Sequence, residues 1–505
     1  MSYITVKNNQ SIFFQEIPVL DYESFLLMNT GFLSKEHLHC VNYYGLAQKE
    51  KLKLICCIAN DHEHSIYVSS CVLPLPHLDE IGFPEYSSFT ARHLSFHIFE
   101  REIHENFGIR YHDHPWLKPV RFAHDRFNKE SGIAEYPFYH IESEELHEVG
   151  VGPIHAGVIE PGHFRFACNG EQILHLEIHC GYQHRGIENL LITKKKLLQR
   201  VTLAESIAGD TVAGHATAFT NVWESLSGCV PRADLQLART LALELERIAI
   251  HTGDLSAICT DIAYQLGASV FGRLRTPLIN FMQEWCGNRL AKGLIRPGYS
   301  NFKFTPELAQ RLEIVLEAYE RDFDEVWDRF HTLPSVLSRL EKTGMVSWHD
   351  ALSIGCVGMA AKTSGIERDI RASHPHDLYT ELRHEPILKI HGDVYSRTQL
   401  RHEEIKQSLV YIRKLLEKVA AQPDSERVLL QAQADRFCLS LTEGWRGEIC
   451  HCAITGKDGE LVHYKIKDPS MHNWLALALA VRNNEISDFP ICNKSFDLSY
   501  CGYDL

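Results

Sequence analysis

The spacing of apolar residues changes near residue 150, and this change constrains the fold more than any other feature of the chain. Before it, short segments with alternating or continuous apolar residues predict β-strands. These segments are residues 11–14, 52–59 and 65–72. After residue 187, apolar residues recur with a helical period. The predicted helices include residues 235–251, 306–330 and 400–420. The chain therefore folds into at least two unlike parts.

A polar stretch separates these parts. Residues 120–147 have no clear period and contain the turn-forming run 127–132, Phe-Asn-Lys-Glu-Ser-Gly. We predict an α+β domain over residues 1–122, a linker over 123–149, and a mostly helical domain with marginal β-sheet over 150–505.

Short strands stand at the margins of the second domain. Residues 164–167 and 173–178 predict a hairpin that turns at Asn169-Gly170. Residues 448–454 and 461–466 predict further strands. The helical layer thus has sheet before and after it in the chain.

Charge and apolar content exclude several classes of protein. The formal net charge of -14 argues against nucleic acid as a partner. No apolar run reaches the roughly 18 to 20 residues that a membrane-spanning helix needs. The N-terminus, Met1-Ser2-Tyr3-Ile4, lacks the basic and apolar regions of a signal peptide. We therefore expect a cytoplasmic location.

The cysteines and histidines do not show the spacing of a metal site. None of the 15 cysteines stands in Cys-x-x-Cys register with another, so we expect reduced core thiols and no iron-sulfur cluster held by this chain. The chain also has 30 histidines. The close pairs, which we interpret as surface histidines, are His62/His64, His112/His114 and His374/His376.

A motif closes the N-terminal domain. Glu100-Arg101-Glu102 is followed by Phe107-Gly108-Ile109 and then by His114-Pro115-Trp116-Leu117. Taken alone, this is a charged helix, a glycine turn and an extended proline segment. It resembles the signature of the smaller peripheral-arm subunit of respiratory complex I. The resemblance implies a structural role, bracing the catalytic subunits.

Two loops carry a second resemblance. Residues 152–166 include His155 and His163, and residues 181–188 read Gly-Tyr-Gln-His-Arg-Gly-Ile-Glu. Their glycines and prolines favour tight turns that present histidines. These loops resemble the large subunit shared by energy-converting nickel-iron hydrogenases and complex I. In complex I the corresponding loop, with a histidine near position 163, borders the quinone head-group.

The same resemblance gives roles to the second loop. In hydrogenases its His-Arg-Gly-x-Glu run lies beside the nickel site, and the glutamate, here Glu188, is linked to proton transfer. Alternatively, Arg185 and Glu188 simply pair inside the fold.

More motifs of this family follow in the family's order. A single one is weak, but a collinear series over almost the whole chain is specific. They are residues 244–251, 295–298, 364–371, 392–397, 443–448 and 467–470. With its fused smaller domain, the chain is similar to the group 4 large subunits of formate hydrogenlyase and hydrogenase-4.

The chain departs from hydrogenases where they bind metal. Such subunits carry two Cys-x-x-Cys pairs, because soft thiolates hold nickel and iron. Here the four positions are Ala208, Thr211, Ser499 and Gly502. We therefore expect no nickel-iron centre. Ala208 and Gly502 are expected to leave space and the other two to leave hydroxyls.

The chain also departs from complex I. That family places a tyrosine beside the first lost cysteine as a donor to quinone, and here the position is Gly209. We predict that His163, Glu188 and Asp210 act as catalytic residues. We predict that His155, Tyr182 and Arg185 line a quinone-binding cavity. A quinone carbonyl needs a donor on reduction, and replacing His163 by alanine should abolish quinone-dependent turnover.

The resemblance implies partners and a function. It implies a peripheral subunit on the cytoplasmic face of the inner membrane, beside an iron-sulfur subunit and membrane-embedded ion-translocating subunits. It would pass electrons from the partner's cluster to a quinone-like acceptor, coupled to ion movement. At the family level, the resemblance also implies electron transport and NAD binding. Two alternatives remain: a non-redox structural or energy-coupling subunit with a vestigial cavity, and an active nickel-iron hydrogenase.

Overall fold

The computed structural model describes residues 2–76, 84–156, 158–419 and 430–505. The N-terminal domain is built on an antiparallel sheet of order β1-β6-β5-β4, with β3 parallel to β6. Its strands are β1 (Ile4–Val6), β3 (Val19–Leu20), β4 (Leu38–Gln48), β5 (Lys51–Asn60) and β6 (Ser65–Pro74). The strands predicted at residues 52–59 and 65–72 are confirmed.

Two helices accompany this sheet. They are α1 (Tyr22–Phe32) and α2 (His97–Phe107). The α2 helix carries the Glu-Arg-Glu motif and ends at Gly108, whose φ of +72° suits a left-handed C-cap. The short strands β7 (Glu85–Ser87) and β8 (Arg110–His112) pair in parallel beside it. The predicted α+β character is confirmed.

The first predicted strand belongs to a different sheet. β2 (Ser11–Phe13) pairs with β12, so that Ile12 faces Phe437 in the register. This sheet has the order β14-β13-β12-β2. Its C-terminal strands are β12 (Arg436–Glu443), β13 (Glu448–Thr455) and β14 (Leu461–Lys467). The N-terminal segment is therefore part of the C-terminal sheet.

The segment between the two domains is mostly irregular, as its polar sequence predicts. It contains one 3₁₀ turn, η3 (Ile133–Glu135). β9 (His147–Val151) then opens a sheet of order β11-β10-β9. The predicted hairpin is confirmed as β10 (His163–Asn169) and β11 (Gln172–His179).

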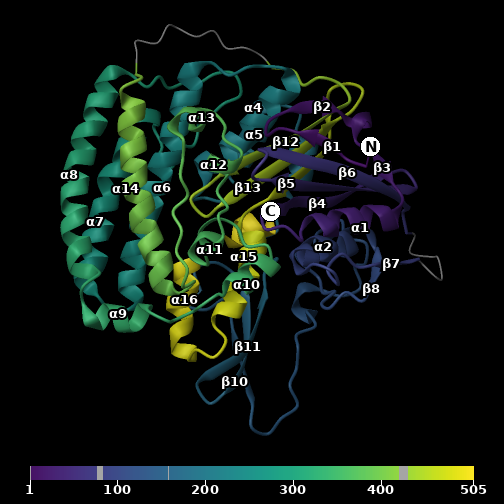
Figure 1. Ribbon diagram of the computed structural model, residues 1–505, viewed down its shortest axis with the longest axis horizontal. Helices are drawn as coiled ribbons and strands as arrows, with labels where there is room; N and C mark the ends of the chain where they lie inside the picture. Colours follow the sequence, from purple (N-terminus) through teal and green to yellow (C-terminus); the bar gives the residue numbers. More distant parts are fainter. Residues whose placement is uncertain (1, 77–83, 157, 420–429) are drawn as a thin grey trace.

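Long helices form a layer on the left of the view in Figure 1, namely α6 (Ala233–Asp261), α7 (Gln265–Cys286), α8 (Pro306–Phe330) and α14 (Val394–Leu416). Another long helix, α5 (Val212–Ser227), packs beside β12 and β13. The predicted helices 235–251 and 306–330 are confirmed within α6 and α8. The helix predicted over residues 400–420 is confirmed as far as Leu416, where α14 ends, and Ala420 lies outside the described residues. Shorter helices connect them: α3 (Ile187–Thr193), α4 (Leu197–Ala204), α9 (Pro334–Leu340), α10 (Trp348–Ser353), α11 (Gly358–Thr363), α12 (Ile370–Ser373) and α13 (Tyr379–Leu382).

The chain ends in the interior. α15 (Ser470–Ala480), α16 (Phe489–Phe496) and α17 (Tyr500–Asp504) follow the last strand, and the C-terminus lies near the centre of the view in Figure 1. Leu505 is only 2% exposed. Across the described ranges, no helix is both long and apolar enough to cross a membrane.

Most of the cysteines lie in the core, as expected, but the surface interpretation is wrong for His114, His374 and His376. The side chain of His114 has no exposed surface. All 15 cysteines are free thiols, and most are buried. His374 and His376, however, are buried rather than on the surface. His374 contacts the carboxylate of Asp61, at 3.2 Å, which compensates for its lost hydration.

Candidate functional site

The two segments with the lost cysteine positions come together at helix N-termini. Thr211 precedes α5, and Ser499 is the N-cap of α17. The Ser499 hydroxyl accepts a hydrogen bond from the Gly502 backbone N–H at 2.9 Å. A serine oxygen suits this capping position because it satisfies a backbone donor that has no helical partner.

Arg185 ties these two segments together. Its guanidinium donates to the carbonyls of Ser206 at 2.5 Å and Ile207 at 2.9 Å, both in the first segment. It also donates to the carbonyl of Cys501 at 2.9 Å, in the second. The backbone N–H of Arg185 donates to Leu505. Arg185 therefore positions the backbone around the site.

An ion pair fills the centre of this region. Arg446 donates two hydrogen bonds to the Asp210 carboxylate, at 2.7 and 2.6 Å, and one to the Thr211 hydroxyl at 3.0 Å. Two parallel bonds of this kind fix both charge and orientation. Burial opposes the charge on Arg446, but Asp210 and Asp497 raise its pKa. The Trp445 ring N–H donates to the Asp210 carbonyl at 2.9 Å.

The residues at the four positions do not fit a nickel-iron centre. None supplies a thiolate, and Ala208 and Thr211 are buried. The expectation of open space is wrong at Gly502. A Cβ there would lie 2.7 Å from a carboxylate oxygen of Asp468 and 2.9 Å from the Ser499 hydroxyl. The protein's own side chains therefore fill this position.

Asp468 is held in place by a buried hydrogen-bonded chain. Its carboxylate accepts from His215 Nε2 at 3.0 Å, and His215 Nδ1 lies 3.1 Å from His451 Nε2. His451 Nδ1 lies 2.8 Å from the Tyr464 hydroxyl. An ionised Asp468 requires His215 to carry its proton on Nε2. His215 Nδ1 then accepts from His451, and His451 Nδ1 accepts from Tyr464.

A cavity of about 470 Å³ opens beside the ion pair, and we call it the C-terminal cavity. Both lost-cysteine segments line it, together with α6, α7 and the loop before β10. Its charged lining residues are Glu160, Asp210, Asp254, Arg275, Arg446, Lys494 and Asp497. The volume is within the range of small-molecule sites, roughly 300 to 1,000 Å³.

Two further carboxylates lie deeper in this cavity. Asp254 accepts from Arg401 Nε at 2.9 Å, and Asp497 accepts from Lys494 at 2.9 Å. The two carboxyl groups also contact each other. Burial and the neighbouring Asp497 raise the pKa of Asp254 to about 8. Asp254 therefore favours its protonated form at neutral pH, as expected when two carboxyl groups are adjacent.

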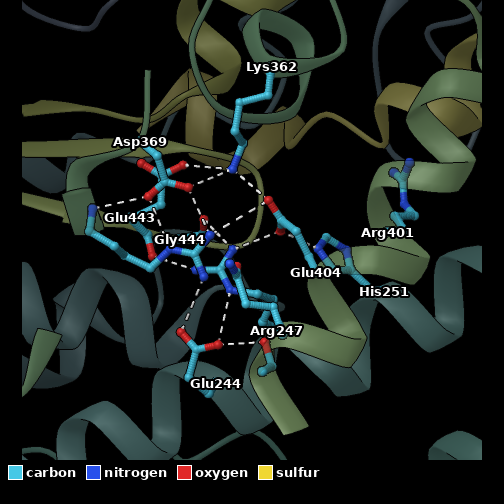
Figure 2. Close-up of polar contacts among 12 residues, drawn as sticks. Glu244, Arg247, His251, Lys362, Asp369, Arg401, Glu404, Glu443 and Gly444 are labelled. Carbon is cyan, nitrogen blue, oxygen red and sulfur yellow. Dashed lines mark hydrogen bonds and ion pairs between the residues drawn. The ribbon is translucent and has the colours of Figure 1, made fainter. Parts of the chain in front are cut away.

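A buried charge network joins residues of α6, α11 and α14 (Figure 2). Glu404 is its centre and contacts Lys362 at 2.5 Å, His251 at 3.0 Å and Arg247 at 3.2 Å. Arg371 adds contacts to Asp369 and Glu244, at 2.8 and 3.4 Å. Such clusters are stable only when each charge has its partner.

The network is connected to the cavity wall by hydrogen bonds to backbone carbonyls. Arg247 donates to the carbonyls of Glu443 at 3.0 Å and Gly444 at 3.3 Å. These residues directly precede Trp445 and Arg446 in the loop between β12 and β13. The network therefore holds the loop that presents the Arg446 guanidinium.

The predicted site residues do not all meet at this cavity. Asp210 lines it, and Arg185 binds its backbone. Glu188 lines a second cavity, of about 300 Å³, between the N-terminal domain and β14. There it accepts from the Ile466 N–H at 2.8 Å and pairs with Lys465 at 3.1 Å. The alternative Arg185–Glu188 pair is not formed, since each has other partners.

The other three predicted residues lie on the β10–β11 side. His163 Nδ1 donates to the Gly152 carbonyl at 3.1 Å, and burial lowers the pKa of His163. The Tyr182 hydroxyl lies 3.5 Å from His179 Nδ1, and His155 is on an exposed loop. Among the residues that the structure describes, His155, His163 and Tyr182 are not part of the C-terminal cavity wall.

Most charged residues of this cavity were not predicted as site residues. Arg446 and Glu160 both stand inside the family motifs, at residues 443–448 and 152–166. The sequence did contain a signal for them, namely a charged residue inside a glycine-rich run. Such runs let the backbone approach a ligand closely. Their approach to Asp210 depends on the tertiary fold.

Comparisons with known proteins agree with the fused architecture. Residues 22–137 match the family of the 30 Kd subunit of respiratory-chain NADH dehydrogenase. Residues 266–437 match the family of its 49 Kd subunit.

Related proteins fall into two groups. The chain is 27% identical over 350 residues to the carbon monoxide-induced hydrogenase of Rhodospirillum rubrum, over 69% of this chain and 96% of that protein. It is 26% identical over 390 residues to hydrogenase-4 component G of Escherichia coli (strain K12), over 77% and 67%. It is 26% identical over 433 residues to the C/D subunit of the NADH-quinone oxidoreductase of Phocaeicola vulgatus, over 79% and 82%. The chain thus has one segment that matches the 30 Kd subunit family and another that matches the 49 Kd subunit family, and it is similar to hydrogenase components and to a fused C/D subunit.

Proposed function

We propose that this chain passes electrons from a partner iron-sulfur subunit to a quinone-like acceptor in the C-terminal cavity. The observation that carries the proposal is the cavity itself, about 470 Å³ in volume and lined by both segments where hydrogenases hold their metal. The cavity combines apolar walls with a fixed cation, Arg446, which suits a small organic acceptor with carbonyl oxygens.

The proposal places the chain in a larger assembly. The relatives are named as an oxidoreductase subunit and as hydrogenase components, and one is named a membrane-bound hydrogenase subunit. We propose that this chain lies on the cytoplasmic face of the inner membrane. There it would contact an iron-sulfur subunit and membrane-embedded subunits that move ions.

The acceptor site can be tested in the assembled complex with two variants. Arg446→Met should reduce quinone-dependent turnover at least 10-fold and weaken binding of a quinone analogue, because it removes the donor in the cavity wall. His163→Ala should have the smaller effect, since His163 does not line this cavity. If His163→Ala lost turnover and Arg446→Met did not, the acceptor would bind at the loop before β10 and not in the C-terminal cavity.

Metal content distinguishes this proposal from hydrogenase activity. The four positions offer no thiolate, so purified protein should contain no stoichiometric nickel, and the complex should neither evolve nor take up hydrogen. Elemental analysis and a hydrogen electrode measure both. One nickel per chain would overturn the assignment of Ala208, Thr211, Ser499 and Gly502 as the ligand positions.

A second candidate is a structural or energy-coupling subunit without redox chemistry. The filling of the Gly502 position by Asp468 favours it, because the old metal position has become part of the core. A wild-type complex that assembles and moves ions but binds no quinone analogue would support this candidate.

A further inference from the structure

The acidic side chains of the C-terminal cavity differ in whether a cation neutralises them. Three are paired at 2.6 to 2.9 Å: Asp210 with Arg446, Asp254 with Arg401, and Asp497 with Lys494. Glu160 is the fourth acidic residue in the cavity wall. Within the described ranges of the chain, no Lys, Arg or His lies within ion-pair distance of Glu160.

Glu160 lies where the cavity meets solvent. It belongs to the loop that precedes β10, and its neighbour Ile159 lines the same cavity while being 68% exposed. The Glu160 carboxyl group accepts from the backbone N–H of Cys501 at 3.3 Å, and its other oxygen lies 4.0 Å from the Cys501 sulfur. One long hydrogen bond from the backbone and one weak bond from the Cys501 thiol leave lone pairs of this carboxyl group available to a ligand.

The surroundings favour the neutral form of Glu160. Burial raises the pKa of Glu160, and the charge of Asp210 raises it further, while the Cys501 N–H and Arg446 oppose the shift. The other titratable groups that act on it or feel its charge are Cys180, Tyr500 and the Cys501 thiol. Burial and a neighbouring like charge both favour the neutral form of a carboxyl group.

We propose that Glu160 is a catalytic acid of the C-terminal cavity, donating a proton to a carbonyl oxygen of the quinone-like acceptor. This inference rests on the proposed function. As an electron from the partner's iron-sulfur cluster reaches the acceptor, the Glu160 O–H bond breaks and an O–H bond forms on the acceptor oxygen. The carboxylate that remains takes a proton from solvent at the loop. Glu160 thereby supplies one of the two protons that hydroquinone formation requires.

The Asp254–Asp497 pair does not replace Glu160 in this role. Asp254 also holds a proton, but it is only 3% exposed and its carboxylate is bound by Arg401. Glu160 is only partly buried and stands beside the exposed Ile159, at the solvent side of the cavity.

The proton on Glu160 is tested first in the isolated full-length chain. Glutamate carboxyl groups labelled with ¹³C are titrated by infrared spectroscopy. We expect one carboxyl signal to titrate above the usual glutamate pKa of about 4.3 and to disappear in Glu160→Gln. The matched control, Glu171→Gln, changes an exposed residue at the tip of the β10–β11 hairpin and should keep the signal. A spectrum in which Glu160→Gln removes only a signal with an ordinary pKa overturns the proposal.

Turnover of the assembled complex tests the donation. Glu160→Gln should lower kcat for quinone reduction about 100-fold, the usual contribution of a general acid, with the Kd of a quinone analogue unchanged. Glu160→Asp should restore part of kcat, and Glu171→Gln should match wild type. A kcat for Glu160→Gln within twofold of wild type overturns the proposal. A wild-type complex that reduces no quinone overturns the proposed function and the catalytic role together, even where Glu160 titrates as expected.

Discussion

Arg446 carries a positive charge into the wall of the C-terminal cavity. Its side chain is buried, and Asp210, Thr211 and the Asp497 carbonyl accept its hydrogen bonds. A guanidinium offers several donors in a fixed plane, so it can hold carboxylate and backbone groups at once. At the scale of single residues, this one side chain connects the 210–211 segment to the end of α16.

Removing the partner of Arg446 should destabilise the chain. In Asp210→Asn the two charge-assisted bonds become weaker, and Arg446 keeps only its more distant charges. Because Asp210 is partly exposed, we expect a loss of about 1 to 2 kcal/mol in the free energy of unfolding. Urea unfolding measures it.

Asp234→Asn is the matched control for this change. Asp234 also pairs with an arginine, Arg232, but at the surface. Its loss should cost less than about 1 kcal/mol, since exposed ion pairs contribute little. Equal effects of the two variants would show that the Asp210–Arg446 pair is no stronger than a surface pair.

At the scale of elements, the N-termini of α5 and α17 define the cavity wall. α17 is short, and it is fixed by Ser499 at its start and by Asp504, whose carboxylate accepts from the N–H groups of Gly181 and Gln183 at 2.6 and 2.8 Å. Burial raises the pKa of Asp504 to about 6. The end of the chain is therefore packed against the loop that begins at Gly181.

Two glycines in this wall should respond oppositely to the same change. Gly502→Ala places a Cβ 2.7 Å from the Asp468 carboxylate, and such overpacking costs about 1 to 3 kcal/mol. Gly209→Ala finds no heavy atom within 4 Å, so its effect should stay within about 0.5 kcal/mol. Thermal or urea unfolding compares the two variants. If Gly502→Ala were as stable as Gly209→Ala, Asp468 would not fill the lost cysteine position.

At the scale of the whole molecule, the two domains share a hydrophobic core and a buried polar contact. β2 and β12 pair, and Val41 and Ile55 of the N-terminal sheet pack in one cluster with Leu439. His39 of the first domain lies 2.6 Å from Glu448 of the second. Motion of one domain against the other would break these contacts.

The charge on His39 makes this contact depend on pH. Burial and Arg368 lower the pKa of His39, but Asp61 at 3.3 Å and Glu448 outweigh them and raise it overall. Because the pKa of His39 is raised in the folded state, protonation of His39 stabilises the fold. This contribution is complete below the unfolded-state pKa of about 6.5 and is lost as the pH rises through the folded-state pKa. His39→Gln should therefore cost roughly 3 kcal/mol at pH 6 and less at pH 9.

Urea unfolding at the two pH values measures this difference. His62→Gln, a change at an exposed histidine in the turn between β5 and β6, is the control and should show little effect at either pH. A loss in His39→Gln that is equal at pH 6 and pH 9 would show that His39 acts through packing rather than charge.

Local sequence patterns were sufficient for many elements. Apolar alternation predicted β5 and β6, helical periodicity predicted α8 over residues 306–330, and Asn169-Gly170 predicted the turn of the β10–β11 hairpin. These patterns are encoded by neighbouring residues. The pattern of β2 predicted a strand, but its partner lies more than 420 residues away.

The sequence by itself determined several strands and helices, the resemblance to fused subunits and the absence of thiolates at Ala208, Thr211, Ser499 and Gly502. Only the tertiary structure decided what took their place. Asp210 meets Arg446, and Asp468 fills the space at Gly502, through contacts between segments that are more than 30 residues apart. The physical reason is that spacing along a chain records local hydrogen bonding and periodicity, whereas the partner of a buried charge depends on how distant elements pack.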